Sequence, residues 1–304
     1  MSIYVETTIR GSLDEVWRRT HDPKQHQRWD LRFTDIEYLP RPDLTKPQRF
    51  LYQTRIGFGL AIAGEGESVG SQVDELDQRT SALKFWSNDP KSLIREGAGF
   101  WQYVPTHDGV RFLTAYDYRV RFGIAGRVID AVVFRPLITW ATAWSFDRLR
   151  LWIENGTEPA ASLRLAMIHW LARLGVAFVW IYQGFAPKLL RQHADELAMI
   201  ADAGLTGNHA GYALWLVGGC EVVFGLSLLF VRQAGRHFAA TIVAMVLATL
   251  MVAIVSPRYL TAAFNPVSLN VLLAAMATIG LLAGSESKHP SARRCRLLRA
   301  RSEK

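Results

Sequence analysis

Two ionisable residues inside long apolar stretches are the first candidates for chemistry. Glu221 lies near the middle of residues 211–231 (GYALWLVGGCEVVFGLSLLFV), where the thiol of Cys220 is the only other ionisable side chain. This stretch has the length of a helix that crosses a bilayer core. A carboxylate at that depth is costly, so Glu221 is expected to face other protein rather than lipid. Arg173 lies in the preceding apolar run, residues 165–186.

The positions of Arg173 and Glu221 leave three interpretations open. In antiparallel helices Arg173 would lie about 12 Å and Glu221 about 15 Å from the cytoplasmic ends, at about 1.5 Å per residue. We favour a buried ion pair between them, because either charge alone is expensive in hydrocarbon. Glu221 could instead handle protons or bind a quinone-like ligand. In the third interpretation Arg173 snorkels to the surface and Glu221 is protonated.

The motifs of several other chemistries are missing from the sequence. It has no phosphate loop, dinucleotide fingerprint, Cys–His metal spacing or haem attachment motif. The Gly-rich segments GFGLAIAG and GEGESVG lie in a series of predicted strands, so we do not expect them to bind phosphate. Cys220 and Cys295 imply neither a disulfide nor a metal cluster. No metal is therefore expected, and a quinone is the cofactor left open.

Aromatic and hydroxyl side chains alternate along the N-terminal half. Concave ligand sites are mostly apolar, with a few polar groups that orient the ligand. Such residues could therefore line a cavity, although aromatic residues at this period also form ordinary core. The candidates for lining a cavity are Trp29, Tyr52, Thr54, Tyr103, Thr114, Tyr116, Tyr118 and Trp144.

Periodicity predicts the elements that would position these side chains. Ser12 and Glu15 have capping-box spacing at the start of a short helix, and Asp22-Pro23 starts a second one. A long amphipathic helix is predicted at 125–155, kinked at Pro136 and packed on the sheet. Its alternative role is to lie in the membrane surface. Alternation predicts strands at about 3–9, 33–39, 48–56, 60–75, 81–86, 99–104 and 111–122.

Residues 1–155 resemble the START-like (SRPBCC) superfamily of polyketide cyclases and lipid-transfer proteins. The resemblance rests on the opening segment ETTIRGSLDEVWRRTHDPKQHQRWD, on the closing helix FRPLITWATAWSFDRLRLWIE and on the order of the elements. It implies an α+β helix-grip fold, in which a curved antiparallel sheet wraps a long helix. It also implies a cavity for an apolar or aromatic ligand.

The C-terminal half of this 304-residue chain is predicted to be an all-α bundle of four transmembrane helices. Each apolar run is close to the span of a hydrocarbon core. A polar linker, residues 156–164 (ENGTEPAAS and neighbours), joins the bundle to the soluble domain. Glycines at 218, 219 and 225 would let another helix approach Glu221 closely. The predicted spans are residues 165–186, 211–231, 238–256 and 266–284.

The loops and the tail predict orientation and partners. Lys and Arg are more frequent in the loops on the side of the N-terminus, which predicts both termini in the cytoplasm and a multi-pass protein of the inner membrane. The formal net charge of +8 comes largely from residues 285–304. A basic segment after a membrane helix favours anionic lipid headgroups rather than nucleic acid as its partner.

The four-span layout resembles the DoxX-like membrane family. The matching residues are RLGVAFVWIYQGFAPKLL (173–190), GGCEVVFGLSLL (218–229) and FNPVSLN (264–270), within about 165–284. The family takes its name from a subunit linked to thiosulfate–quinone oxidoreduction, and many members have no assigned activity. The resemblance therefore carries over no catalytic residue.

These expectations favour a membrane protein whose cytoplasmic START-like domain binds a hydrophobic small molecule or lipid beside the bilayer. Two other functions stay open. One is an enzyme, either a quinone- or thiol-linked oxidoreductase subunit or a cyclase-like activity in the soluble cavity. The other is a non-catalytic scaffold for a protein partner.

Overall fold

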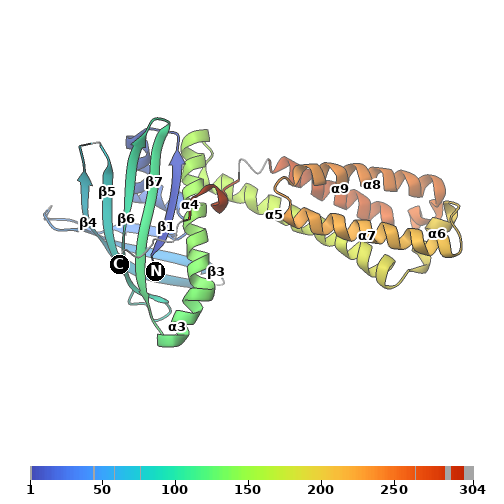
Figure 1. The fold of residues 1–304 in the computed structure, drawn as a ribbon, viewed down its shortest axis with the longest axis horizontal. Helices are drawn as coiled ribbons and strands as arrows, with labels where there is room; N and C mark the ends of the chain where they lie inside the picture. The colour runs from blue at the N-terminus through green and yellow to red at the C-terminus, as the bar shows by residue number, and fades with distance from the viewer. Residues whose placement is uncertain are drawn as a thin grey trace. The chain divides into compact units, whose positions relative to one another are not determined.

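The computed structural model describes residues 2–43, 45–57, 59–75, 77–263, 265–284 and 289–297. The chain forms two compact units (Figure 1). One comprises the residues up to Ser162 together with the C-terminal segment from Pro290, and the other comprises Leu163–His289. We call the first the soluble unit and the second, which contains the apolar runs, the membrane unit. The membrane unit is therefore inserted between two segments of the soluble unit.

The soluble unit is built on a seven-stranded sheet with the order β1-β7-β6-β5-β4-β3-β2. All neighbouring strands are antiparallel, so the chain from β2 to β7 is a meander and β1 pairs with its last strand. The predicted strands are confirmed, and three of the seven, β3, β5 and β6, are longer than predicted. They are β1 (Ile3–Ile9), β2 (Asp35–Tyr38), β3 (Gln48–Gly57), β4 (Leu60–Val73), β5 (Arg79–Trp86), β6 (Ile94–Thr106) and β7 (Gly109–Val120).

Two short helices, α1 (Leu13–His21) and α2 (Pro23–Trp29), connect β1 to β2. The predicted helix starts are confirmed. Ser12 Oγ accepts a hydrogen bond from the backbone N–H of Glu15 at 3.2 Å, and Asp22 Oδ1 accepts one from Lys24 N at 2.9 Å. Each cap satisfies a backbone donor that has no partner inside its helix.

A nearly continuous helical segment follows β7 and lies along one face of the sheet (Figure 1). It consists of α3 (Gly123–Ile129), the π-helical turn η1 (Asp130–Phe134) and α4 (Arg135–Asn155). The predicted irregularity at Pro136 is realised as this π turn, with the proline in the first turn of α4. Gly156 ends α4 in the left-handed conformation, at φ 65°.

The core lies between α4 and the sheet. Trp29, Tyr103, Phe112 and Phe146 are fully buried there. The rings of Phe112 on β7 and Phe146 on α4 stack with centroids 4.4 Å apart. A sheet closed by one long helix through aromatic packing is the predicted helix-grip fold.

The C-terminal segment returns to the soluble unit and packs on it. Arg296 forms an antiparallel bridge with Glu6 of β1, with N···O distances of 2.8 and 3.1 Å. The fully buried carboxylate of Asp147 on α4 accepts bonds from Ser291 N at 2.7 Å and Arg294 Nη1 at 2.8 Å. Cys295 Sγ donates to Ala143 O at 3.2 Å.

The described part of the predicted basic tail, 285–304, includes this docked segment. Arg294 contributes its side chain and Arg296 its backbone to the contacts just given, and contact of the tail with anionic headgroups stays a prediction. The segment also covers β1, which is an edge strand of the sheet. A basic composition alone did not reveal this docking, because it does not show the buried carboxylate of Asp147 elsewhere in the chain.

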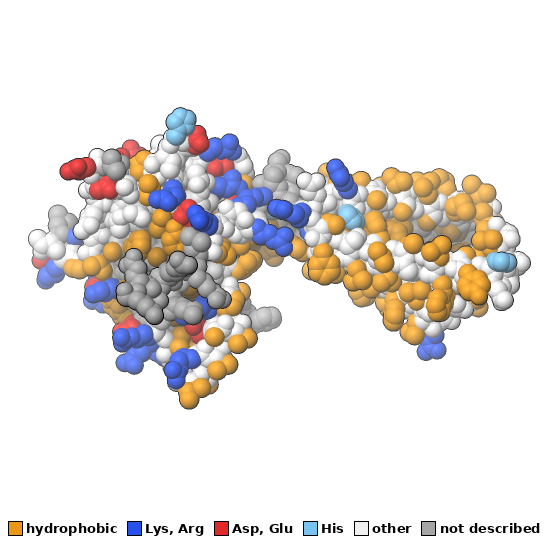
Figure 2. Space-filling model, in the orientation of Figure 1, with side chains coloured by type: hydrophobic (Ala, Val, Ile, Leu, Met, Phe, Trp, Pro, Cys, Tyr) orange, Lys and Arg blue, Asp and Glu red, His pale blue; other side chains and the backbone are white. Residues whose placement is uncertain are grey.

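The membrane unit consists of apolar helices whose surface is covered by hydrophobic side chains (Figure 2). The segment predicted to be a linker, 156–164, is helical from Pro159 onward, because α5 starts there. The bounds are α5 (Pro159–Gln183), continued by the π-helical η2 (Gly184–Leu190), then α6 (Ala194–Asp202), α7 (Asn208–Phe230), α8 (Gly235–Val255), the short η3 (Pro257–Thr261) and α9 (Pro266–Leu282).

Among the described residues, three helical stretches are long and apolar enough to cross a membrane, and α9 is a shorter apolar helix. The three are Pro159–Leu190, Asn208–Phe230 and Gly235–Val255. The first is 32 residues long, and the sequence analysis placed only its apolar middle in the span. The second and third coincide with the predicted spans within a few residues.

Small residues bring α7 against the first helical stretch. An added Cβ on Gly218 would lie 2.8 Å from Gly184 O, and one on Gly225 would lie 2.9 Å from Ala177 O. The predicted close approach is therefore confirmed at these two glycines. Gly219 faces open space, so it has no such role.

We predict that Asp147→Asn loosens the C-terminal segment. Removing one partner of a buried ionic network costs about 3–5 kcal/mol, and the segment depends on this carboxylate. Burial raises the pKa of Cys295 to about 12, so its thiol should react slowly with maleimide in the intact protein. In a Cys220→Ser background, the variant should label at Cys295 at least about tenfold faster.

Glu96→Gln is the matched control, because Glu96 forms an ion pair with the exposed Arg119 at the surface of the same unit. This control should leave the labelling rate unchanged. Equal rates for wild type and Asp147→Asn would contradict the role assigned to the buried carboxylate.

Candidate functional site

The structure divides the predicted cavity residues into three groups. Trp29, Tyr103, Thr114, Tyr116 and Tyr118 are buried between the sheet and α4. Tyr52 and Thr54 are half-buried on β3. Trp144 is outside the core cluster, and its ring stacks on the exposed Trp140 at 5.4 Å. The buried residues of the first group mainly pack the core. The half-buried residues lie where the face of the sheet that α4 covers, its inner face, is accessible.

A row of directly opposed residues crosses that inner face from β3 to β7. Because opposed residues in a sheet share a face, all of its side chains point to the side that α4 covers. Aromatic residues and glycines alternate along it, and Phe50 and Phe85 are only half-buried. We call it the aromatic–glycine row: Phe50, Gly66, Phe85, Gly97 and Tyr118.

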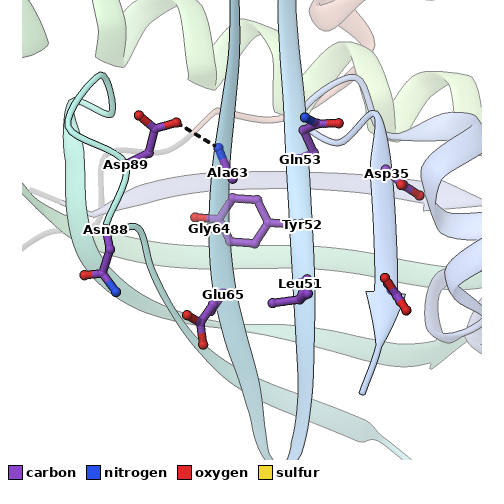
Figure 3. Close-up of a pocket in the computed structure, with 10 residues that line it drawn as sticks. Asp35, Leu51, Tyr52, Gln53, Ala63, Gly64, Glu65, Asn88 and Asp89 are labelled. Carbon is purple, nitrogen blue, oxygen red and sulfur yellow. Dashed lines mark hydrogen bonds between the residues drawn. The ribbon is translucent and has the colours of Figure 1, made fainter. Parts of the chain in front are cut away.

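The glycines let the aromatic rings lie flat on the sheet. An added Cβ would lie 2.3 Å from Phe50 Cζ at Gly66 and 2.3 Å from Phe85 Cζ at Gly97. Tyr52 lies over Gly64 in the same way, at 2.2 Å (Figure 3). The sequence analysis missed Phe50 and Phe85. The signal was the period-two glycines of GEGE and GAG, since glycine inside a strand marks a close approach.

A buried ionic cluster lies near one end of α2. Arg32 Nη2 donates to Asp30 Oδ2 at 2.6 Å, and Arg32 Nε donates to Asp30 Oδ1 at 2.9 Å. His26 Nε2 lies 3.0 Å from Asp30 Oδ2. Burial would raise the pKa of Asp30, but the charge of Arg32 and the bonds from both partners outweigh it and hold that pKa well below its usual range. Arg32 Cζ is 5.7 Å from the ring centre of Tyr116.

A second ionic cluster connects β7 to the π turn. Tyr118 OH donates to Asp130 Oδ1 at 2.6 Å, and Arg135 Nε donates to Asp130 Oδ2 at 3.1 Å. Burial first, and then the bond to Asp130, raise the pKa of Tyr118 well above its ordinary value. Tyr118 therefore stays a protonated donor and fixes the start of the long helix to the sheet.

An open depression of about 320 Å³ lies over β2, β3 and β4 (Figure 3). Of the predicted cavity residues, only Tyr52 lines it. Asp89 Oδ2 accepts a bond from Ala63 N at 3.3 Å at its edge. Carboxylates dominate its polar lining, so it does not suit an anionic ligand: Asp35, Glu37, Glu65 and Asp89.

The membrane unit contains a cluster of three charges centred on Lys188 of η2. Its Nζ lies 3.0 Å from Glu221 Oε2 on α7 and 3.4 Å from Glu196 Oε1 on α6, and it donates to Gln183 O at 3.3 Å. The lysine side chain is buried among these partners. Two carboxylates share one ammonium group, next to a π-helical turn that contains Pro187.

The predicted ion pair between Arg173 and Glu221 is therefore corrected, since the carboxylate pairs with Lys188. Arg173 Nε donates to Leu228 O at 2.7 Å, and its Nη2 donates to Val231 O. These carbonyls form the C-terminal end of α7, which carries unsatisfied acceptors and partial negative charge. Leu228 lies seven residues after Glu221, about 10 Å along the helix, so Arg173 is at a different level.

Comparisons with known proteins agree with these two units. Residues 177–278 match the model of the DoxX-like family, a range that includes Lys188, Glu196 and Glu221. The class is thus a membrane protein with a DoxX-like helical domain and an N-terminal unit that has the helix-grip fold. The chain is also 47% identical over 185 residues to YndG, an uncharacterized membrane protein of Bacillus subtilis (strain 168), covering 60% of this chain and 69% of YndG. It belongs to the same family as YndG.

Solved structures with similar folds match about half of the chain. They include the di-domain ARO/CYC protein StfQ from the steffimycin biosynthetic pathway, with 17% identity, 50% of each chain and a TM-score of 0.41. A STAR-related lipid transfer protein from Xanthomonas axonopodis has 17% identity, 49% of this chain, 83% of that chain and a TM-score of 0.38. Protein jhp0584 from Helicobacter pylori has 18% identity, 50% and 86% coverage, and a TM-score of 0.39.

We predict that Lys188→Met destabilises the membrane unit in detergent. The substitution leaves Glu196 and Glu221 without the ammonium group they share, and an uncompensated buried charge costs about 3–5 kcal/mol. The melting temperature of the full-length protein should fall clearly. Lys188→Met combined with Glu221→Gln should melt higher than Lys188→Met alone, because one orphaned charge is removed.

Arg191→Met is the matched control, because this exposed arginine lies three positions further on. It should change the melting temperature little. If Lys188→Met melted at the same temperature as this control, the cluster would not stabilise the unit.

Proposed function

We propose that the soluble unit binds an uncharged hydrophobic small molecule or lipid beside the bilayer. The observation that carries this proposal is the aromatic–glycine row, which presents half-buried rings on the inner face of the sheet. Flat aromatic surfaces bind apolar ligands through contact area without charge. The DoxX-like helices keep such a receptor next to a store of apolar molecules.

The charges near the row argue for an uncharged ligand. Arg32 is matched by the buried Asp30, and Arg135 is matched by Asp130. Neither cluster has an excess positive charge to bind an anionic group. Hydroxyls remain as orienting groups, since Tyr116 OH and Thr142 Oγ1 lie 2.9 Å apart on the inner face. A ligand with one neutral polar group fits this pattern.

We predict that the full-length protein purified in mild detergent carries an apolar adduct in native mass spectrometry, and that Phe85→Ala reduces its occupancy. Loss of one ring contact weakens binding by about 1–2 kcal/mol, or roughly tenfold. Phe100→Ala is the matched control, because Phe100 is an exposed phenylalanine on the next strand, β6.

The labelling rate of Cys295 shows whether the Phe85→Ala variant is folded, since that thiol is buried only in the intact unit. An adduct equally retained by Phe85→Ala and Phe100→Ala would contradict binding at the row. The absence of any adduct from the wild-type protein in several detergents would contradict the proposed function itself.

A second candidate function places a quinone at the Lys188 cluster. It is supported by two carboxylates sharing one buried ammonium group beside a π-helical turn, because π turns occur frequently at functional sites. The same spectra separate the two candidates. A quinone mass that is lost in Lys188→Met and kept in Phe85→Ala would favour this function.

We also propose four membrane crossings with both termini in the cytoplasm. The bridge between Glu6 and Arg296 supports an even number of crossings, because the segments before and after the membrane unit build one soluble unit. The fourth crossing is then α9, whose 17 residues span about 25 Å. Arg232 in the α7–α8 loop and Arg236 in the first turn of α8 support a cytoplasmic orientation of that loop.

This topology predicts which single cysteines react with an impermeant maleimide in intact cells, in a Cys220→Ser background. Thr206→Cys, in the exposed turn before α7, should react directly. His107→Cys in the β6–β7 turn and Gln233→Cys in the α7–α8 loop should react only after permeabilisation. Direct labelling at 107 would reverse the orientation, and labelling of 206 and 233 from the same side would reject α7 as a crossing.

A further inference from the structure

The long helical segment of the soluble unit exposes a continuous apolar surface. Its side chains range from 46% exposed at Trp140 to 74% at Ile124. Apart from the neighbours Val132 and Val133, they recur at intervals of three or four residues, as one face of a helix requires. We call this surface the apolar ridge: Ile124, Val128, Val132, Val133, Leu137 and Trp140.

The charges of this segment are arranged in the opposite way to those of a helix that faces water. Asp130 is buried and binds Tyr118, and Arg135 is half-buried and pairs with Asp130. Between residues 122 and 140, Arg127 is the one exposed charge. Surface helices normally turn their apolar side inward and their charges outward. The Tyr118–Asp130–Arg135 cluster thus fixes the apolar side outward.

The backbone before the ridge adds an independent observation. Phe122 and Gly123 are both left-handed, at φ 64° and 56°, and Phe122 is 58% exposed. A left-handed conformation costs a residue with a bulky side chain about 1–3 kcal/mol. The turn from β7 into α3 therefore holds a phenylalanine out of the core and extends the ridge at its N-terminal end.

Exposed apolar surfaces of this kind mark interaction sites. One possible partner, the membrane, is always close to this surface. The chain is a membrane protein, and three residues, Gly156–Glu158, separate the end of α4 from the first membrane-crossing helix. The soluble unit is therefore never far from a bilayer, which makes the membrane the surface with the highest effective concentration.

The chemistry of the ridge also fits a lipid surface. It combines branched aliphatic side chains with the stacked pair Trp140 and Trp144, and indole rings favour the membrane interface. Its one exposed charge is the cation Arg127, which suits anionic headgroups, and no exposed carboxylate lies between residues 122 and 140. Figure 2 shows hydrophobic side chains along the edge of the soluble unit where α3 and α4 lie in Figure 1.

We propose that the apolar ridge lies in the bilayer interface, with α3, η1 and the first half of α4 forming an interfacial helix. The soluble unit then has two attachments to the membrane, one through α5 and one through the ridge. This inference does not depend on ligand binding by the soluble unit. It adds a fixed orientation, in which the side of the unit that carries the ridge faces lipid.

The test measures the depth of a spin label in the full-length protein, reconstituted in nanodiscs of phosphatidylethanolamine and phosphatidylglycerol. Labels are placed at Val132→Cys or Val133→Cys on the ridge and at His107→Cys in the exposed β6–β7 turn, in a Cys220→Ser background. The ratio of accessibility to oxygen over accessibility to a water-soluble nickel complex should be several-fold higher at both ridge positions than at 107.

Two results would overturn the proposal. One is an accessibility ratio at the ridge equal to that at 107, which would place the ridge in water. The other is strong dipolar broadening between ridge labels that disappears on dilution with unlabelled protein, which would make a second copy of the chain the occupant. The slow reaction of Cys295 with maleimide confirms that each variant is folded, and the two ridge positions guard against a failure of either one.

Discussion

The carboxylate of Asp147 carries its charge in the middle of α4, with none of its side chain exposed to water. Such a charge requires partners, and it finds them in Arg150 on its own helix and in Ser291 and Arg294 near the end of the chain. This requirement closes the soluble unit over its edge strand. It also connects the segments on either side of the membrane unit, together with the bridge between Glu6 and Arg296.

The need of a buried charge for partners also determines contacts elsewhere in both units. Asp130 needs Tyr118 and Arg135, and satisfying it turns the long helix so that its charges face the sheet. Lys188 needs Glu196 and Glu221, and satisfying it joins η2, α6 and α7. Arg173 donates hydrogen bonds to the carbonyl end of α7. A helix end can therefore be one of the partners of a buried cation.

Periodicity was sufficient to predict most elements and insufficient to predict pairings. The strands, the long helix and the apolar runs follow from local patterns of two or 3.6 residues, which a single sequence displays. The partner of Glu221 was predicted wrongly because the first membrane helix was predicted to end too early. Hydropathy ended it before Pro187, whereas the structure continues it as a π-helical turn and brings Lys188 level with Glu221. The docking of residues 291–296 joins positions more than a hundred residues apart, which no local pattern records.

The cavity candidates show the same limit. Alternation correctly placed Tyr116 and Tyr118 on the inner face, but it could not distinguish closed core from accessible surface. That distinction depends on which residues lie opposite each other, and the row exists because Phe85 is opposed by a glycine on each side. Trp144 was assigned to the inner face because it is aromatic and helical, while its position relative to Phe146 turns it toward the ridge.

Tyr118 connects the two surfaces for which we propose roles, the aromatic–glycine row and the apolar ridge. Its ring is the last member of the aromatic–glycine row, and its hydroxyl holds Asp130 between the two halves of the ridge. The same helix is also held by the hydrogen bond between Tyr116 OH and Thr142 Oγ1 and by the stacking of Phe112 on Phe146. The residues that orient the ridge and those that form the row therefore belong to one packed layer between the helix and the sheet.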